Sequence, residues 1–342
     1  MEKTLPIKYP MITSYPEIAN LMSILETDER AIPWICSNLN QIVFKRANNY
    51  VNGMQYEMQF NRQFYKHYSN IPILEYNQIH KNIISMKWPT FSDFIVELIE
   101  NGYYIQTHLD HYYMPNSWFY HKSNYFHSTF IYGYDSDQGT IKIADFYMGN
   151  KYDHYNISSD SMNKAFNGSI SQEVESFNYI ILIKIKENYI SPPINMRYMK
   201  RSLLDYIESK DSFNLFEYST EWSDFKFYFG LSYYDELIKE LHQDKLRRSM
   251  HVVYDHAKIT KYKLKILHER DYINQTDFVQ LNELICTIEH LALVNRNKYL
   301  KIYIKNRENI DRNVLDLLAK NILNLKEESE NFTLKLIDAI KE

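Results

Sequence analysis

Residues 121–147 read HKSNYFHSTFIYGYDSDQGTIKIADFY, and this stretch predicts a β-hairpin. Two β-rich runs, Ser128 to Tyr134 and Thr140 to Phe146, flank the turn-rich segment YDSDQG. Antiparallel pairing would place His127, at the entry to the first strand, beside Asp145, near the end of the second. A carboxylate that holds one imidazole nitrogen leaves the other free to take a proton from a nucleophile. The hairpin therefore predicts His127 as a catalytic base and Asp145 as the acid that orients it.

The chain before and after this hairpin mixes helices and strands. Helices are predicted over residues 15–25, from Pro33 onward, and over FSDFIVELIENG, residues 91–102, whose terminal glycine suits a left-handed C-cap. Further strands are predicted at residues 103–107 and 178–185. Helices come first and strands follow, which is the α+β order.

The pattern of the sequence changes at Ser191-Pro192-Pro193, where two prolines must break regular structure. Beyond them nearly the whole chain has the apolar periodicity of helices, which predicts an antiparallel helical bundle. The predicted helices cover residues 199–209, 233–242, 246–269, 277–297 and 312–341. We therefore expect two domains, an α+β domain over 1–192 and a helical domain over 193–342.

Composition excludes several classes of protein. The 342 residues include 39 basic and 43 acidic side chains, a formal charge of −4, so a general nucleic-acid binder is not expected. The longest apolar run, Tyr179 to Ile185, is too short to span a membrane. No secretory signal is visible at the N-terminus, and the two cysteines, Cys36 and Cys286, cannot build a disulfide framework. These features favour the cytoplasm.

Four histidines lie close together in the sequence, at positions 108, 111, 121 and 127. Neither an HExxH pair nor CxxC pairs accompany them, so packed or surface histidines are expected and no metal site is predicted. No phosphate-binding glycine loop occurs either, and no cofactor is expected. Asp110 is interpreted as either a hydrogen-bonding residue within its own segment or a solvated loop acid.

The hairpin resembles the papain-like family typified by the N-terminal domain of butirosin biosynthesis protein H. The family pattern of a histidine, an apolar run, Gly-Tyr-Asp and an Ala-Asp-Phe ending is matched by His127, STFIYGYD and IADF with Asp145. DHYYMPNSWFYHKS is similar to the family's Asp-x-Tyr-Tyr-x-Pro segment. YFGLSYYDEL and SMHVVYDHAKITKYKLKIL are similar to the Tyr-Gly-Leu-x-x-Tyr and His-x-x-Tyr-x-His-Lys segments of its helical part.

This resemblance implies a papain-like cysteine-peptidase-type domain followed by an all-α domain. It also implies an acyltransferase or amide synthase of natural-product assembly, which moves an acyl group from a carrier-protein phosphopantetheine thioester to a small-molecule amine. The alternative is a catalytically impaired binding protein of such an assembly line. A peptidase is disfavoured, because cleavage of an unactivated amide depends most on an activated nucleophile.

The nucleophile that the family expects is a cysteine at the start of the first helix, where this chain reads ITSYPEIANLMSIL without one. In one alternative Cys36 serves instead, in the first turn of the second helix, where the helix dipole would lower its pKa; otherwise it is a buried apolar residue. In another, Ser14 is the nucleophile; otherwise it caps the first helix in a capping box with Glu17. In the third, no covalent step occurs and His127 acts as a general base on the amine.

Aromatic residues cluster between positions 103 and 120, and they predict either an acyl pocket or a packed interface. We expect Tyr113 and Trp118 to line the pocket. The helical domain leaves the oligomeric state open, since a bundle can form a homodimer or cover the first domain.

Overall fold

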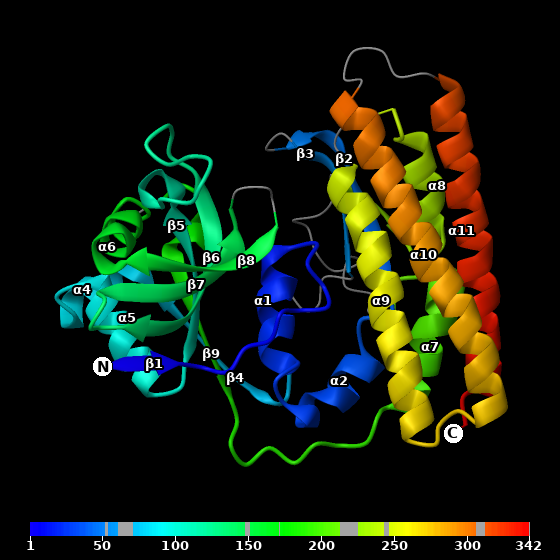
Figure 1. The fold of residues 1–342 in the computed structure, drawn as a ribbon, viewed down its shortest axis with the longest axis horizontal. Coiled ribbons are helices and arrows are strands. Elements are labelled where there is room, and N and C mark those ends of the chain that lie inside the picture. The colour runs from blue at the N-terminus through cyan, green and yellow to red at the C-terminus, as the bar shows by residue number, and fades with distance from the viewer. Residues whose placement is uncertain are drawn as a thin grey trace. The chain divides into compact units, whose positions relative to one another are not determined.

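The computed structural model describes residues 1–51, 54–60, 71–147, 151–170, 172–212, 225–242, 246–305 and 312–341. The chain divides into two compact units (Figure 1). Unit 1 comprises residues 1–31 and 64–191, and unit 2 comprises residues 32–63 and 192–342. The division at 191/192 lies next to the expected boundary, but the expected first domain also included residues 32–63, which group with the C-terminal helices.

Unit 1 contains an antiparallel sheet with the strand order β4-β9-β5-β6-β7-β8, and the short strand β1 pairs with part of β6. These strands are β1 (Glu2–Thr4), β4 (Leu74–His80), β5 (Tyr104–Asp110), β6 (Phe126–Asp135), β7 (Thr140–Phe146), β8 (Tyr152–Ser158) and β9 (Tyr179–Ile185). The hairpin and the strands expected at 103–107 and 178–185 are confirmed. Strands β1, β4 and β8 were not predicted.

The β6–β7 hairpin holds a central place in this sheet. Its turn is closed by Asp135, whose Oδ1 accepts hydrogen bonds from the backbone N–H groups of Asp137 and Gln138 at 3.0 and 3.1 Å. Gly139 follows with φ +63°, a conformation that L side chains rarely adopt. Residues 128–134 are all buried, as expected for a central strand that is covered on both faces.

Helices cover this sheet in unit 1. They are α1 (Pro16–Leu25), α4 (Ile84–Lys87), α5 (Phe91–Glu100) and α6 (Ser159–Asn167). Helix α1 contacts β6 and β7, α5 contacts β1, β5 and β6, and α6 contacts β5, β7 and β8. Helix α5 begins with a capping box between Thr90 and Asp93, and its Phe91 stacks on Phe166 of α6 with ring centroids 4.0 Å apart.

The N-terminus of α1 differs from the prediction. The N-cap residue is Tyr15, with no side-chain cap hydrogen bond, and Pro16 occupies the first turn. The expected capping box between Ser14 and Glu17 is therefore wrong. The proline explains the shift by one residue, because its fixed φ and missing N–H suit the first helical position, so Ser14 falls one residue too early to cap.

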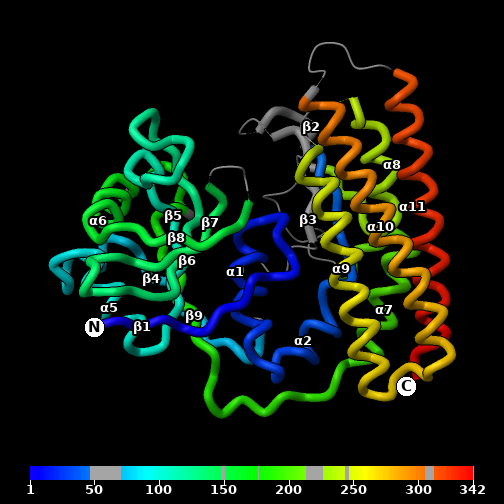
Figure 2. Tube along the Cα trace, viewed as in Figure 1, coloured from blue at the N-terminus to red at the C-terminus, as the bar shows by residue number. Residues whose placement is uncertain are grey.

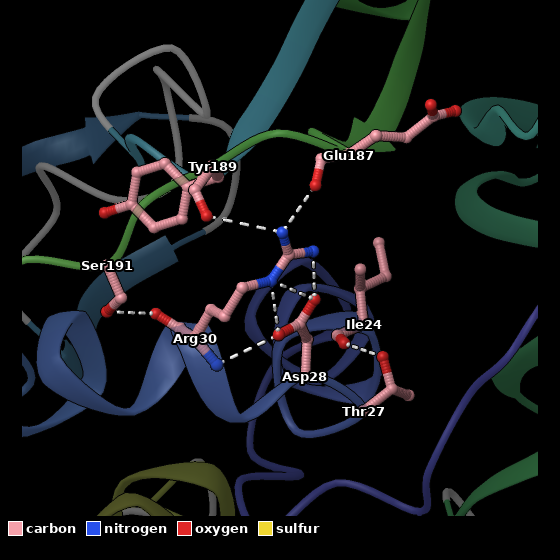
Figure 3. Close-up of polar contacts among 7 residues, drawn as sticks. All are labelled: Ile24, Thr27, Asp28, Arg30, Glu187, Tyr189 and Ser191. Atoms are coloured by element: carbon pink, nitrogen blue, oxygen red, sulfur yellow. Dashed lines mark hydrogen bonds and ion pairs between the residues drawn. The ribbon is translucent and has the colours of Figure 1, made fainter.

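The two ends of unit 1 are tied together by Arg30 (Figure 3). Its guanidinium forms an ion pair with Asp28 at 2.7 Å and donates to the carbonyl oxygen of Glu187, also at 2.7 Å. The hydroxyl of Ser191 donates to the carbonyl oxygen of Arg30 at 2.8 Å. The chain leaves unit 1 after residue 31 and again after residue 191. These hydrogen bonds therefore join the two segments at which it leaves.

Unit 2 contains a three-stranded antiparallel sheet. It also contains several helices, of which α9, α10 and α11 are long (Figure 2). The strands are β2 (Ile42–Val51), β3 (Met54–Phe60) and β10 (Phe225–Phe229), and the helices are α2 (Ile32–Ser37), α7 (Met196–Ile207), α8 (Ser232–Lys239), α9 (Arg247–Glu269), α10 (Gln275–Lys305) and α11 (Arg312–Ala339). The predicted C-terminal helices are confirmed. The expectation of an all-α domain is wrong, because β10 pairs with β2 from the distant segment 32–63.

Candidate functional site

The hairpin brings His127 of β6 and Asp145 of β7 together. Nδ1 of His127 lies 2.8 Å from Oδ1 of Asp145. The carboxylate is fully buried, and the imidazole keeps 19% of its side-chain surface exposed. An antiparallel pair places these two positions at the same end of the ribbon, because β6 begins where β7 ends. The juxtaposition expected from the sequence is therefore present.

Hydrogen bonds from a side chain and from the backbone hold Asp145 in place. Its Oδ2 accepts from Thr129 Oγ1 at 2.8 Å, and its Oδ1 accepts from the backbone N–H of Phe146 at 2.6 Å. Burial alone would raise the pKa of this carboxyl, but the charge of His127 and hydrogen bonds from His111 and His127 outweigh burial and hold the pKa well below its usual range. Asp145 is thus an anion that stays ionised beside its imidazole partners.

A second histidine, His111, shares the same carboxylate. It lies in the 3₁₀ turn η4 (His111–Tyr113) that follows β5, is 2% exposed, and places Nε2 3.3 Å from Oδ2 of Asp145. Its Nδ1 lies 3.2 Å from Ser117 Oγ, which accepts the N–H of Phe119 at 3.2 Å. Since that hydroxyl still has its own proton to donate to Nδ1, the arrangement favours the tautomer of His111 that carries its proton on Nε2.

The loop that carries His111 is anchored by Asp110, which is fully buried. Oδ1 of Asp110 accepts from the backbone N–H groups of Tyr112 and Tyr125 at 3.0 and 3.2 Å, and Oδ2 accepts from the amide of Asn124 at 2.5 Å. These bonds join the two ends of loop 111–125. Of the two interpretations of Asp110, hydrogen bonding within its own segment is confirmed.

Aromatic rings pack beside His127. Tyr125 stacks on its imidazole with centroids 5.7 Å apart, and Phe119 stacks on Tyr125 at 4.1 Å. The two aromatic residues chosen from the sequence lie on the same loop: Tyr113 packs edge-on against Tyr112 at 4.9 Å, whereas Trp118 is 54% exposed. The structure thus gives the imidazole an aromatic neighbour, Tyr125, that was not singled out in the sequence.

Cys36 does not have the features of an activated thiol. Helix α2 spans Ile32–Ser37, so Cys36 lies in its last turn, where the helix dipole does not favour a thiolate. The residue is fully buried, and burial raises the pKa of its thiol to about 11 despite the charges of Lys263 and Arg270. Of the two interpretations of Cys36, the lowered pKa in a first turn is wrong, and the buried apolar residue is confirmed. Cys36 also belongs to unit 2, whereas His127 and Asp145 belong to unit 1.

Ser14 belongs to unit 1 and precedes α1. It is 6% exposed, and its Oγ has no hydrogen-bond partner among the residues that the structure describes. A buried hydroxyl without a partner costs free energy, so this residue has no evident structural task of the kind that the capping box would have supplied.

The other two histidines of the sequence cluster have separate surroundings. His108 stacks on Phe177 at 4.3 Å, and burial lowers its pKa to about 3, so it is a neutral packing residue at physiological pH. His121 is exposed and packs against Tyr120 with centroids 4.0 Å apart. The expectation of packed or surface histidines therefore fits these two, while His111 and His127 converge on Asp145.

The chemistry available here is proton transfer by an imidazole oriented by an ionised carboxylate. The three side chains also offer ligand atoms to a metal, since two imidazole nitrogens and one carboxylate oxygen lie within 4.8 Å of one another. No sequence motif links His111 to the hairpin. The sequence offered one signal: the loop after β5, the strand that pairs with β6, has to return to the start of β6.

Comparison with known proteins finds no matching family model and no significant match among curated proteins. None of the described helices combines the length and the apolar character that a membrane crossing requires.

Proposed function

We propose that unit 1 is a papain-like domain that acts as an acyltransferase or amide synthase of natural-product assembly. The acyl donor is a carrier-protein phosphopantetheine thioester, and the acceptor is a small-molecule amine. The observation that carries the proposal is the 2.8 Å contact between His127 Nδ1 and the buried, ionised Asp145. This contact assigns Nδ1 to orientation and leaves Nε2 as the nitrogen that exchanges protons with substrate.

In this reaction the amine nitrogen attacks the thioester carbonyl carbon and forms the C–N bond. The C–S bond breaks as the tetrahedral intermediate collapses. His127 takes the proton from the attacking amine and returns it to the departing pantetheine sulfur, so the products are an amide and a free thiol. Asp145 stabilises the imidazolium that exists between the two proton transfers.

The route without a covalent enzyme intermediate is favoured by the state of Cys36. A thiol with a pKa near 11 contains little thiolate at neutral pH, and it is the thiolate that attacks. A thioester is already activated, and general-base catalysis typically contributes about 10²–10⁴-fold, which suffices for such a donor. Aromatic rings at Tyr125 and Phe119 offer apolar contact for an acyl or aryl group beside the imidazole.

The test uses synthetic acyl-pantetheine thioesters of short alkyl and aryl acids together with a panel of primary amines. Thiol release and the amide mass are measured for the wild type, His127→Ala, Cys36→Ala and Ser14→Ala, with the exposed His121→Ala as the matched control. We expect His127→Ala to lose about 10²–10⁴-fold in rate. Cys36→Ala and His121→Ala should retain activity, and no acyl adduct should appear on the protein by intact mass.

Three outcomes contradict the proposal in different ways. An acyl adduct on Cys36, or on Ser14 with loss of activity in Ser14→Ala, would replace the non-covalent route by a covalent one. Unchanged turnover in His127→Ala would end the catalytic interpretation. Saturable binding of the pantetheine thioesters without turnover would favour the alternative, an accessory binding protein of an assembly line.

A further inference from the structure

The carboxylate of Asp145 has more imidazole partners than a proton-transfer dyad needs. His127 alone would complete the dyad, yet His111 lies against the other oxygen of the same carboxylate. The side chain of His111 is only 2% exposed, so its contact with Asp145 is part of the packed interior and not a contact between mobile surface side chains. Two imidazoles that face one buried anion form a set of ligands that transition metals prefer.

We propose that His111, Asp145 and His127 together bind one divalent transition-metal ion such as Zn²⁺, and that the bound ion removes His127 from the dyad. Metal binding itself does not depend on the proposed function, whereas the silencing of His127 rests on it. Asp145 supplies a negative charge, and the neutral imidazoles supply nitrogen ligands. A 2-His-1-carboxylate set of this kind suits Zn²⁺ and Fe²⁺ and leaves a coordination position open.

The distances between ligand atoms fit a small ion. In a tetrahedral site with metal–ligand bonds of about 2.0–2.1 Å, neighbouring ligand atoms lie about 3.3–3.4 Å apart. His127 Nδ1 lies 2.8 Å from Oδ1 of Asp145, and His111 Nε2 lies 3.3 Å from Oδ2. One ligand atom from each of the three residues can be chosen so that all three lie within 4.8 Å of one another. The separation at His127 is shorter than in such a site, so the half-buried His127 ring would have to move away from Asp145 when the ion binds.

The surroundings supply the outer hydrogen bonds that metal ligands commonly have. On metal binding the proton of His111 would lie on Nδ1, the nitrogen that does not bind the ion, and would be donated to Ser117 Oγ. Asp145 accepts from Thr129 and from the backbone of Phe146. Tyr147 packs edge-on against His111 at 5.2 Å, and its buried hydroxyl has no hydrogen-bond partner within the described part of the chain. The exposed fraction of His127 gives the ion access to solvent.

Occupancy by metal and dyad chemistry exclude each other. The atom of His127 that the ion would bind is Nδ1, the same atom that contacts Asp145. When Nδ1 is coordinated, the one proton of the neutral imidazole lies on Nε2, so Nε2 has no lone pair left to take a proton from substrate. The same three side chains therefore give an active form without the ion and a silenced form with it.

The test is zinc binding to the full chain after removal of metal with a chelator, measured by native mass spectrometry and by calorimetric titration. We expect one Zn²⁺ per chain, and Co²⁺ in its place should give the visible absorbance of a four- or five-coordinate site. His111→Gln, Asp145→Asn and His127→Gln should each weaken binding by at least tenfold, on the scale of ligand-sphere substitutions. His121→Ala is the matched histidine control and should bind as the wild type does.

Absence of stoichiometric zinc binding in the wild type would overturn the proposal, as would equal binding by the wild type and by folded His111→Gln. Circular dichroism identifies ligand variants that fail to fold. In that case Ser117→Ala supplies the comparison, because it leaves all three ligands in place and removes only the contact to His111. A zinc affinity equal to that of the wild type would also count against the site. None of these measurements uses an acyl donor. Zinc binding by a protein whose metal-free form shows no thioester turnover would therefore refute the proposed function and leave the metal site standing.

Discussion

A single buried carboxylate, Asp145, holds the side chains of the candidate site in unit 1 together. Asp145 accepts hydrogen bonds from a hydroxyl and a backbone N–H and lies against two imidazoles. Because its pKa is held well below the usual range, it is charged wherever the protein is folded at ordinary pH. A charge that is buried with this many partners stabilises the fold only while it remains charged.

Asp145→Asn should therefore change how stability depends on pH. The folded pKa lies below the unfolded value of about 3.9, so the wild type has the full stabilisation above pH 4–5 and loses it as the pH falls further. The variant should be less stable at pH 7 by at least about 1 kcal/mol, and the difference should shrink towards pH 3.

Urea unfolding at a series of pH values measures this difference, with the exposed Asp316→Asn as control. Parallel stability curves for the wild type and Asp145→Asn across the acid range would show that the carboxylate is not coupled to folding in this way.

The dyad was accessible from the sequence, whereas its second imidazole was not. A short turn determines the register of a hairpin, so His127 and Asp145 could be placed opposite each other from the positions of two β-rich runs. The position of His111 depends on how a loop returns after β5, which no local pattern records. The predicted pKa of Cys36 was wrong for a similar reason. The observed pKa is raised by burial, which depends on the tertiary fold and not on the neighbours of Cys36 in the sequence.

At the scale of elements, loop 111–125 is the part that brings aromatic rings and His111 to the dyad. Its two ends are joined through Asp110, whose Oδ1 accepts the N–H groups of Tyr112 and Tyr125. The loop passes so close to α6 that a Cβ on Gly168 would lie 2.9 Å from Tyr113 Cε2 and 3.1 Å from Asp110 Oδ2. The loop is therefore held by one buried side chain and by a close backbone approach.

Asp110→Ala should loosen this loop and lower stability. It would leave two backbone N–H groups and the Asn124 amide without their acceptor, at a cost of about 1–3 kcal/mol for each group that stays buried. Amide hydrogen exchange should speed up at Tyr112 and Tyr125 while the β7–β8 pair keeps its protection. Asp110→Asn, which keeps one acceptor oxygen, should lie between the wild type and Asp110→Ala. Equal exchange in all three proteins would contradict the anchoring role.

The elements that sequence patterns missed depend on distant partners. Strand β10 lies in a region dominated by helical periodicity, and it is a strand because β2 offers an edge to pair with. Strand β4, LEYNQIH, lies at the edge of its sheet and alternates too weakly to be recognised. In contrast, β6 and β7 carry strong apolar runs and a clear turn, so local preference and tertiary environment agree there.

At the scale of the whole chain, unit 2 is assembled from two separated segments. Asn40 donates to Ser202 Oγ at 2.8 Å, and its own side-chain oxygen accepts from Lys263 at 2.7 Å. Lys263 is buried, and burial lowers its pKa to about 7. The helices therefore enclose an amine whose hydrogen-bond acceptors come from residues 38–40, far away in the sequence.

A fragment of residues 192–342 should accordingly be unstable on its own. It lacks β2 and β3, and it leaves the Lys263 amine without the Asn38 and Asn40 oxygens, which costs about 1–3 kcal/mol for a buried polar group. Circular dichroism and size-exclusion chromatography should show reduced helix content or aggregation relative to the full chain. Lys263→Met in the same fragment should recover part of the helix. A fragment that unfolds cooperatively at the temperature of the full chain would contradict this prediction.

The Arg30 contacts have a consequence for how the protein is made. By the time residue 191 leaves the ribosome, unit 1 has both of its closing segments, and Arg30 can join them. Residues 32–63 have been synthesised by then, but one edge of strand β2 stays unpaired until Phe225–Phe229 have also been synthesised. Nascent chains that stall between these points would display an uncovered strand, and such edges are where newly made proteins aggregate or recruit chaperones.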